Sequence, residues 1–276
     1  MSLTLGVAAL LMLGSYTRQA LYPAPRVPVP SPAPEPLAEV VLPVAGGVEV
    51  VGWAWAPPAP PPGAPAVLFL HGNGENLETM RRAGLFAELR GLGVPFLAID
   101  YPGYGRSGGR PSEEGLTAAG AAALAWLAAR HPERPLVACG WSLGAAVAVA
   151  LAASPEHRVA GLVALSPWSS LRDVARVHFF ALGGFLVSER YDSVEAAARI
   201  RVPALLIHGR RDGIIPFRLG EKLAAALPAA TTRFVPIPDA GHNDLLGHPM
   251  VWVELERFLR LGVHRAGRAM DGTPRD

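Results

Sequence analysis

The chain has 276 residues, of which 50% are hydrophobic and 17% are charged. A chain this apolar can bury a large core, so global intrinsic disorder is excluded. Basic residues exceed acidic ones by only two (25 against 23), and only the tail after Arg257 resembles a clustered basic face, so we expect no nucleic-acid partner. The single cysteine, Cys139, excludes an internal disulfide and a cysteine-rich zinc site. The length fits one domain or two.

The N-terminal segment is apolar and uncharged over Leu3–Tyr16, a length that suits the core of a signal peptide. Extended to Tyr22, it reaches about 30 Å as a helix, which is one hydrocarbon core, with tyrosines at the interface. We expect residues 1–22 to be a hydrophobic anchor or signal segment that brings membrane association through residues 3–22. A cleaved signal on a secreted or periplasmic chain and a soluble helix on a cytoplasmic chain stay open as alternatives. Arg18 and Arg26 favour a cytoplasmic position for the rest of the chain.

Residues 23–37 form a proline-rich linker, in which proline at every second or third position favours extended backbone. A second proline cluster occupies Pro57–Pro65. The residues from 23 to 65 hold 14 of the 28 prolines, so the remaining chain has ordinary proline content. We expect one domain over residues 38–262 and a flexible tail over residues 263–276.

The domain alternates between short apolar runs and helix-length segments. The first two runs, Glu39–Val44 and Val48–Trp55, predict an antiparallel pair around a Gly-Gly turn. Six further strands are expected at Ala66–Leu70, Val94–Ile99, Pro135–Trp141, Val159–Leu165, Ala204–His208 and Arg233–Ile237. Helices are expected at Leu77–Leu92, Ser112–Arg130, Ser142–Ala153, Phe217–Leu227 and Met250–Leu261. This alternation predicts an α/β fold with a mainly parallel central sheet and helices on both faces. Residues 167–200 interrupt it and indicate a small inserted cap.

Two segments match the pattern G-x-S-x-G of a nucleophilic serine, one around Ser142 and one around Ser107. A nucleophile elbow needs a strand that runs directly into the serine and a helix that leaves it. Ser142 has both, and Gly140 and Gly144 permit the close approach of the two elements. Ser107 follows a Pro/Gly loop and precedes Gly-Gly-Arg-Pro, which cannot begin a helix. We therefore predict that Ser142 is the nucleophile.

The glycines at 103, 105 and 108 formally match a dinucleotide-binding fingerprint after a strand. No helix opens at the third glycine, and no acidic residue lies about 20 positions further on, so we reject nicotinamide-cofactor binding. No metal-binding motif such as H-E-x-x-H is present. We expect neither a cofactor nor a metal ion.

A serine hydroxyl needs a base to take its proton and a carboxylate to orient that base. His242 lies in a Gly-His turn directly after the last predicted strand, whereas His208 ends a strand, where a core histidine is the simpler interpretation. Asp212 follows the same strand as His208, which places it at the carboxyl edge of the sheet, where such folds assemble their sites. We predict His242 as the base and Asp212 as the acid. Asp173, Asp192 and Asp239 are weaker candidates.

A tetrahedral intermediate also needs two backbone N–H donors, which together form an oxyanion hole. Leu143 follows the nucleophile at a helix N-terminus and is expected to supply one. The glycine-rich loop after Ala66–Leu70 is expected to supply the other, from Asn73 or from Gly74, with Asn73 preferred. His71 in this loop and Asp100 after the next strand are interpreted as structural supports.

These motifs together resemble the α/β-hydrolase superfamily, and most closely its branch with an N-terminal membrane anchor and a small cap. The residues that carry the resemblance run in order as His71-Gly72-Asn73, Asp100 to Ser107, Gly140 to Gly144, Ser169 to Asp173, His208 to Pro216 and Gly241 to Asp244. The resemblance covers about residues 38–262. It implies serine-dependent hydrolysis of esters, thioesters or, less often, amides, as in esterases, lipases, depalmitoylases and proteins filed with serine aminopeptidases.

The expected activity is hydrolysis of carboxylic esters or thioesters through a Ser-His-Asp triad and an acyl-enzyme. The expected substrate is a small-molecule or lipid-like acyl compound. An acyltransferase or a peptidase with the same triad is an alternative, as is a non-catalytic binding protein on this fold. The apolar run Val177–Val187 in the cap would suit an acyl chain, but a pocket lining and a cap core have the same pattern here.

Overall fold

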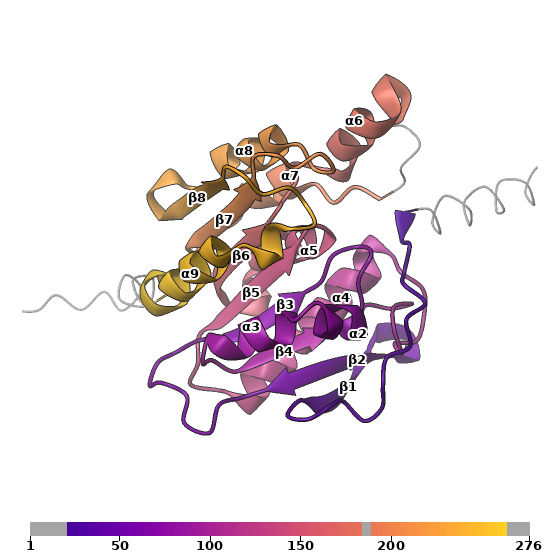
Figure 1. The fold of residues 1–276 in the computed structure, drawn as a ribbon, viewed down its shortest axis with the longest axis vertical. Helices are drawn as coiled ribbons and strands as arrows, with labels where there is room; N and C mark the ends of the chain where they lie inside the picture. The colour runs from indigo at the N-terminus through magenta and orange to yellow at the C-terminus, as the bar shows by residue number, and fades with distance from the viewer. Residues whose placement is uncertain (1–20, 184–188, 264–276) are drawn as a thin grey trace, which may run out of the picture.

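The structure is a computed structural model that describes residues 21–183 and 189–263 (Figure 1). The predicted anchor or signal segment up to residue 20 and the predicted tail from residue 264 lie outside the described residues. Among the residues that are described, no helix is both long and apolar enough to cross a membrane.

Within the described residues, eight strands form one sheet in the order β1-β2-β4-β3-β5-β6-β7-β8 (Figure 1). β1 pairs with β2 and β2 with β4 in antiparallel fashion, and all the other pairs are parallel. The strands are β1 (Ala38–Val44), β2 (Val48–Trp55), β3 (Ala66–Leu70), β4 (Phe96–Ile99), β5 (Leu136–Trp141), β6 (Val159–Leu165), β7 (Ala204–Gly209) and β8 (Thr232–Ile237). The predicted α/β-hydrolase architecture, with a mainly parallel sheet and an antiparallel first pair, is confirmed.

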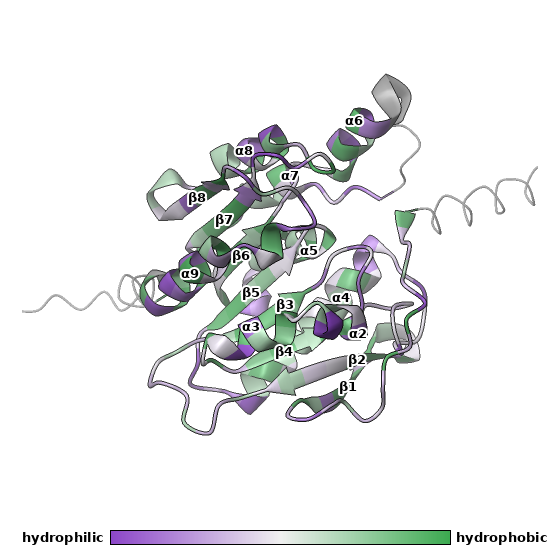
Figure 2. Cartoon of the chain, viewed as in Figure 1, coloured by the Kyte–Doolittle hydropathy of each residue, from purple (hydrophilic) through white to green (hydrophobic). Residues whose placement is uncertain are grey.

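Helices cover both faces of the sheet (Figure 1), and the central strands β3 to β7 are mostly hydrophobic and buried (Figure 2). The helices are α2 (Leu77–Arg82), α3 (Leu85–Gly91), α4 (Glu113–Arg130), α5 (Leu143–Ala152), α6 (Leu171–Gly183), α7 (Ser193–Ala197), α8 (Phe217–Ala226) and α9 (Pro249–Arg257). In β3, Leu68 packs in one core with α4, α5 and α8, whereas Phe69 packs in the other with α2, α3 and α9. This alternation follows from the two-residue period of a strand, and it explains why β3 to β7 are almost continuously apolar.

The prediction of a single helix over Leu77–Leu92 is wrong, because the structure has the two short helices α2 and α3 there. Gly84 stands between α2 and α3 with φ 82°, in the left-handed region that ends one helix before the next begins. Two side chains cap the helices that they precede. The Ser112 hydroxyl accepts from the Gly115 amide at 3.0 Å at the start of α4, and His248 Nδ1 accepts from the Met250 amide at 3.2 Å at the start of α9.

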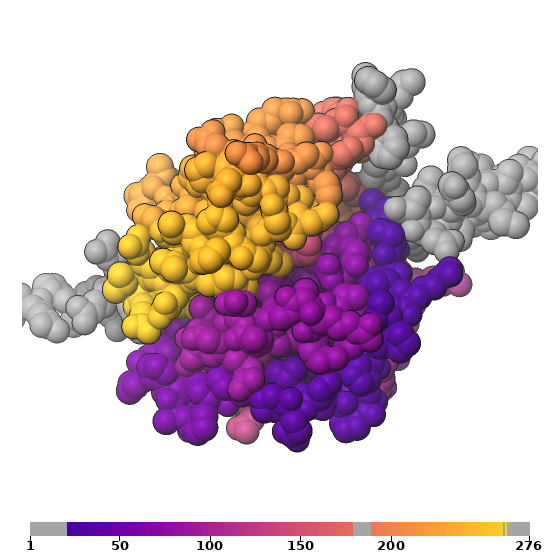
Figure 3. Space-filling model, viewed as in Figure 1, coloured from indigo at the N-terminus to yellow at the C-terminus, as the bar shows by residue number. Residues whose placement is uncertain are grey.

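The proline-rich residues 23–37 have no regular secondary structure, yet they lie along the body of the domain (Figure 3). Val29, Ala33 and Leu37 are buried in the core that also holds α2 and α3. The Asn76 amide donates from Nδ2 to the Val27 carbonyl at 2.8 Å. Proline removes backbone donors, so the segment packs through side chains and accepts hydrogen bonds instead of joining the sheet.

The residues between β6 and β7 depart from the alternation, as the sequence predicts. α6 and α7 lie in this insertion, and Figure 1 shows α6 extending away from the sheet. The side chains from 179 to 188, which include most of the apolar run in the predicted cap, lie outside the described part.

Candidate active site

Ser142 stands at a sharp turn between β5 and α5. Its φ of 56° is positive, which for a residue other than glycine costs on the order of 1–3 kcal/mol and persists only where the surroundings impose it. The surroundings do so through two glycines. A Cβ on Gly140 would lie 2.0 Å from the Gly144 carbonyl oxygen, and a Cβ on Gly144 would lie 2.0 Å from the Leu70 carbonyl oxygen. Strand and helix therefore pack too closely for any side chain at either position.

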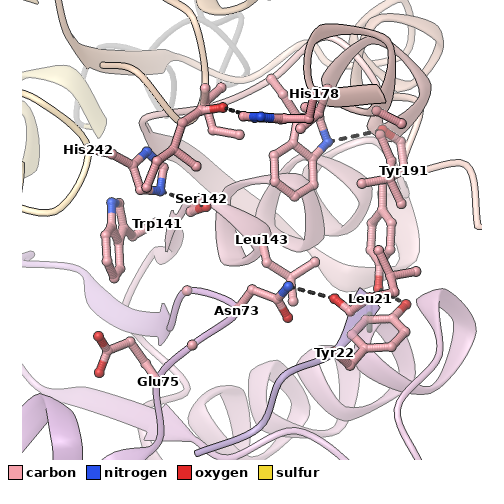
Figure 4. Close-up of a pocket in the computed structure, with 18 of the residues that line it drawn as sticks. Leu21, Tyr22, Asn73, Glu75, Trp141, Ser142, Leu143, His178, Tyr191 and His242 are labelled. Carbon is pink, nitrogen blue, oxygen red and sulfur yellow. Dashed lines mark hydrogen bonds between the residues drawn. The ribbon is translucent and has the colours of Figure 1, made fainter. Parts of the chain in front are cut away.

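The structure brings the three predicted side chains together at the carboxyl edge of the sheet. His242 Nε2 lies 3.0 Å from the Ser142 hydroxyl (Figure 4), and His242 Nδ1 lies 2.7 Å from Asp212 Oδ2. All three residues are buried, with exposed fractions between 6% and 8%. Because a carboxylate can only accept, Nδ1 carries the proton toward Asp212 and Nε2 is left to accept from the serine.

Asp212 is held by four groups. Its Oδ1 accepts from the Ile214 and Ile215 amides at 3.0 and 2.7 Å, while its Oδ2 faces His242 and lies 3.3 Å from His208 Nε2. Burial by itself would raise the pKa of Asp212, but hydrogen bonds from His208, His242 and the Ile215 amide outweigh it and hold the pKa below its ordinary value. The carboxylate is therefore ionised at neutral pH and favours a proton on the facing imidazole nitrogen.

His208 also belongs to the site, and sequence reasoning missed its role there. It is fully buried, as expected of a core histidine, but its Nε2 lies between the Ile215 carbonyl oxygen at 2.9 Å and the carboxylate of Asp212. The available signal was the four-residue spacing from His208 to Asp212 at a strand end.

The loop that carries His242 is shaped by its own residues. Asp244 Oδ1 accepts from the Gly241 amide at 2.6 Å, which closes a short turn around the histidine. The ring of Trp141, directly before the serine, lies against the imidazole with the ring centres 5.4 Å apart. These contacts fix the orientation of the imidazole from two sides.

The weaker candidate acids lie elsewhere. Asp173, in the inserted region, pairs with Lys222 of α8 at 2.7 Å, and the Asp192 carboxylate caps α7 by accepting from the Glu195 amide at 3.0 Å. Asp239 is largely exposed and lies 3.4 Å from His248. The carboxylate that contacts His242 is instead that of Asp212.

The second serine pattern forms a structural turn. The Ser107 hydroxyl accepts from the Val51 amide and donates to the Asp100 carbonyl, both at 2.9 Å. Asp100 Oδ1 accepts from the Leu77 amide at 2.9 Å and lies 3.5 Å from His71 Nε2. The structural interpretation of Ser107, His71 and Asp100 fits these contacts.

The two predicted oxyanion donors border the same cavity as the serine. Leu143 is the first residue of α5, so its amide has no partner within the helix. The Asn73 side chain is fixed on both sides, since its Nδ2 donates to the Leu21 carbonyl and its Oδ1 accepts from the Tyr104 hydroxyl, each at 2.6 Å. Any contribution of Asn73 to a bound oxyanion therefore has to come from its backbone.

A cavity of about 530 Å³ opens in front of Ser142 (Figure 4). Its walls are mainly apolar and aromatic, and among the described residues that line it there is one carboxylate, Glu75, and neither lysine nor arginine. His178, from the run Val177–Val187 that the sequence offered for an acyl chain, lines the cavity, and so do Tyr22, Trp168 and Tyr191, which sequence reasoning did not single out. His178 is held by the Ile214 carbonyl oxygen, which lies 2.8 Å from its Nε2. In the described ranges, no group of three or more His, Cys, Asp or Glu side chains could hold a metal ion.

Comparison with known proteins places the chain in a family. Residues 65–196 match the family model of the alpha/beta hydrolase fold. An uncharacterised protein of Mycobacterium tuberculosis (strain ATCC 25618 / H37Rv) is 40% identical over 243 residues, which cover 83% of this chain and 84% of the relative. The chain belongs to the α/β-hydrolase family.

Two further comparisons concern characterised proteins. The lysophosphatidylserine lipase ABHD12 of Macaca fascicularis is 32% identical over 220 residues, covering 70% of this chain and 54% of the lipase. The chain thus matches about half the length of that relative. The esterase Pf2001 of Pyrococcus furiosus has a TM-score of 0.69 at 20% identity, covering 87% of this chain and 99% of the esterase, which shows a shared fold.

Proposed function

We propose that the protein is a serine hydrolase that cleaves carboxylic esters or thioesters through an acyl-enzyme. The observation that carries the proposal is the continuous hydrogen-bonded series from Ser142 through His242 to Asp212, at a strained elbow that faces an apolar cavity. Geometry of this kind suits a nucleophile, its base and an orienting acid.

In the first step the Ser142 oxygen attacks the substrate carbonyl while its proton passes to His242 Nε2. The amides of Leu143 and Asn73 stabilise the resulting oxyanion. His242 then returns the proton to the leaving alcohol or thiol as its bond to the acyl carbon breaks. Water, deprotonated by the same nitrogen, releases the acid and restores the serine. Asp212 stays ionised throughout and stabilises the imidazolium.

The proposed substrate is a lipid-like ester with one extended apolar chain. About 530 Å³ lies within the usual range for a pocket that holds one small ligand, and the apolar lining favours an acyl chain. Relatives named as lysophosphatidylserine lipases support a lipid ester, although the chain spans about half the length of the one compared above. This proposal also puts the protein in the small-cap branch that its motifs resemble.

Membrane attachment through residues 3–22 is a separate proposal, supported by the apolar sequence of that segment. The test is sedimentation of the full chain with membranes after an alkaline carbonate wash. Recovery of the chain in the soluble fraction would contradict attachment by an inserted helix.

The proposed activity is tested by hydrolysis of p-nitrophenyl acyl esters by the full chain. Ser142→Ala is expected to lower kcat by about 10⁴-fold or more, because it removes the nucleophile and leaves only binding and the oxyanion donors. Ser107→Ala is the matched control, since it removes the same hydroxyl from the same sequence pattern. Equal rates for Ser142→Ala and the unmodified enzyme would refute the proposal.

A further inference from the structure

We propose that Leu21 and Tyr22 form a clasp that positions the active site. The clasp, defined as these two residues, holds the Asn73 loop through a backbone carbonyl and the inserted region through a hydroxyl. The inference rests on the proposed function. It assigns a positioning role to the end of a segment whose sequence predicts only an anchor or signal.

The first contact of the clasp is with the oxyanion loop. Asn73 Nδ2 donates to the Leu21 carbonyl at 2.6 Å, and Figure 4 shows this bond directly beside the cavity. On its other side, Asn73 accepts from Tyr104, whose side chain is fully buried. A side chain fixed at both ends fixes its own backbone, so the direction of the Asn73 amide depends on the position of Leu21. A donor that shifts by a fraction of an ångström stabilises the developing oxyanion less well.

The second contact is with the inserted region. The hydroxyls of Tyr22 and Tyr191 lie 2.9 Å apart, and each residue is only 4% exposed. Both tyrosines line the cavity, so this bond joins two of its walls (Figure 4). Tyr22 therefore differs from the interfacial tyrosine expected of a membrane anchor, because its side chain is buried in the domain.

Tyr191 is itself fixed in an unusual conformation. Its φ is 36°, and its amide donates to Glu113 Oε1 at 2.9 Å at the start of α4. Its carbonyl accepts from Trp168 Nε1 at 3.3 Å. Burial raises the pKa of the Tyr191 phenol well above its ordinary value, so the hydroxyl stays neutral and able to share a proton with Tyr22. The clasp thus connects the N-terminal segment to a residue that is held by Glu113 and Trp168.

A tether that only linked a domain to a membrane would need no buried polar contacts. Leu21 and Tyr22 instead make two polar contacts at the cavity, a part-buried one with Asn73, which is proposed to bind the oxyanion, and a buried one with Tyr191. The consequence is that processing after Tyr22 removes one of the cavity walls.

The test uses full-length variants and the rate at which a fluorophosphonate probe labels the enzyme. Tyr22→Phe keeps the ring and removes the bond to Tyr191, and it is expected to slow labelling and lower kcat/KM about fivefold, the effect of one net hydrogen bond. Tyr22→Ala also removes the wall and should have the larger effect. Arg106→Ala is the control, because it removes contacts with the Pro30 carbonyl in the linker and with Glu39 in β1, both outside the cavity lining, and should change the rate less than about twofold.

The double variant Tyr22→Phe/Tyr191→Phe tests whether the two hydroxyls act as one contact. Because the two hydroxyls bond to each other, the double variant should be no slower than the slower single one. The clasp would be overturned if the double variant lost labelling rate by the product of the two single-variant losses. It would also be overturned if both Tyr22 variants were labelled as fast as the unmodified enzyme.

Failure of the proposed function is distinguishable from failure of the clasp. If the unmodified enzyme takes up no probe, the serine-hydrolase proposal fails, and the clasp is then measured by amide hydrogen exchange. Faster exchange over residues 72–76 in Tyr22→Ala than in Arg106→Ala would support it, and equal exchange would overturn it.

Discussion

The molecule contains two sets of serine, histidine and aspartate that look alike in sequence and differ in structure. In the first set, Ser142, His242 and Asp212 contact one another through side chains alone. In the second set, His71 and Asp100 lie 3.5 Å apart, but the Ser107 hydroxyl bonds to the backbone of Asp100 and of Val51. A hydroxyl already paired with two backbone groups holds a turn together, whereas one that faces an imidazole nitrogen can lose its proton.

The local backbone explains the difference between the two serines. Ser142 follows a strand and begins a helix at a positive φ, which exposes its hydroxyl to the cavity. Ser107 lies in a turn whose amides and carbonyls need partners, and its side chain supplies them. The shared five-residue pattern therefore identifies a nucleophile only when the elements on either side are known.

The largest expected contrast is between the two aspartates. Asp212→Asn should lower kcat about 10⁴-fold, because an amide facing His242 Nδ1 favours the wrong tautomer. Asp100→Asn should leave kcat per folded molecule within about threefold, since the carboxylate serves only the turn. Ester hydrolysis normalised to correctly folded protein measures both. A similar loss from the two substitutions would mean that the sets are not functionally distinct.

The two serines should differ in the opposite sense when stability is measured instead of activity: the substitution at Ser107 destabilises the fold, and the one at Ser142 stabilises it. Ser107→Ala leaves the Val51 amide without its partner, and is expected to lower the free energy of unfolding by about 1–3 kcal/mol. Ser142→Gly should raise it by about 1 kcal/mol, because glycine adopts a positive φ without strain, while activity is lost. Urea unfolding curves measure both changes. A destabilising Ser142→Gly would contradict the strained elbow.

The smallest expected effect is on the pH dependence of stability. The pKa of Asp212 is lower in the folded chain than in the unfolded one, so its contribution is present above the unfolded pKa of about 4. That contribution is lost as the pH falls through the folded pKa. Asp212→Asn should therefore flatten the loss of stability below about pH 4, relative to the unmodified chain. If stability falls equally steeply below about pH 4 in Asp212→Asn and in the unmodified chain, folding does not preferentially stabilise the ionised carboxylate.

Features encoded within a few neighbouring residues could be predicted from the sequence. The apolar runs predicted the parallel sheet, and the order strand, glycine, serine and helix predicted the elbow at Ser142. His242 and Asp212 followed from their places after the last two strands. Each of these predictions depends on local pattern plus the rule that parallel strands end at one edge.

Features that depend on distant contacts could not be predicted. Tyr22 and Tyr191 are 169 positions apart, and nothing near either residue indicates the bond between them. His208 has the sequence context of a core histidine, and its contact with Asp212 depends on how the loop after β7 turns back. The break at Gly84 was missed because a lone glycine in an otherwise helical pattern is often tolerated.

The most direct test of the account is the position at which a fluorophosphonate becomes attached. Peptide mapping of the labelled full-length enzyme by mass spectrometry should find the phosphonyl group on Ser142, at one equivalent per chain, and the label should be absent in Ser142→Ala. Attachment to Ser107, or no attachment to well-folded protein, would contradict the assignment of Ser142 as the nucleophile of this hydrolase.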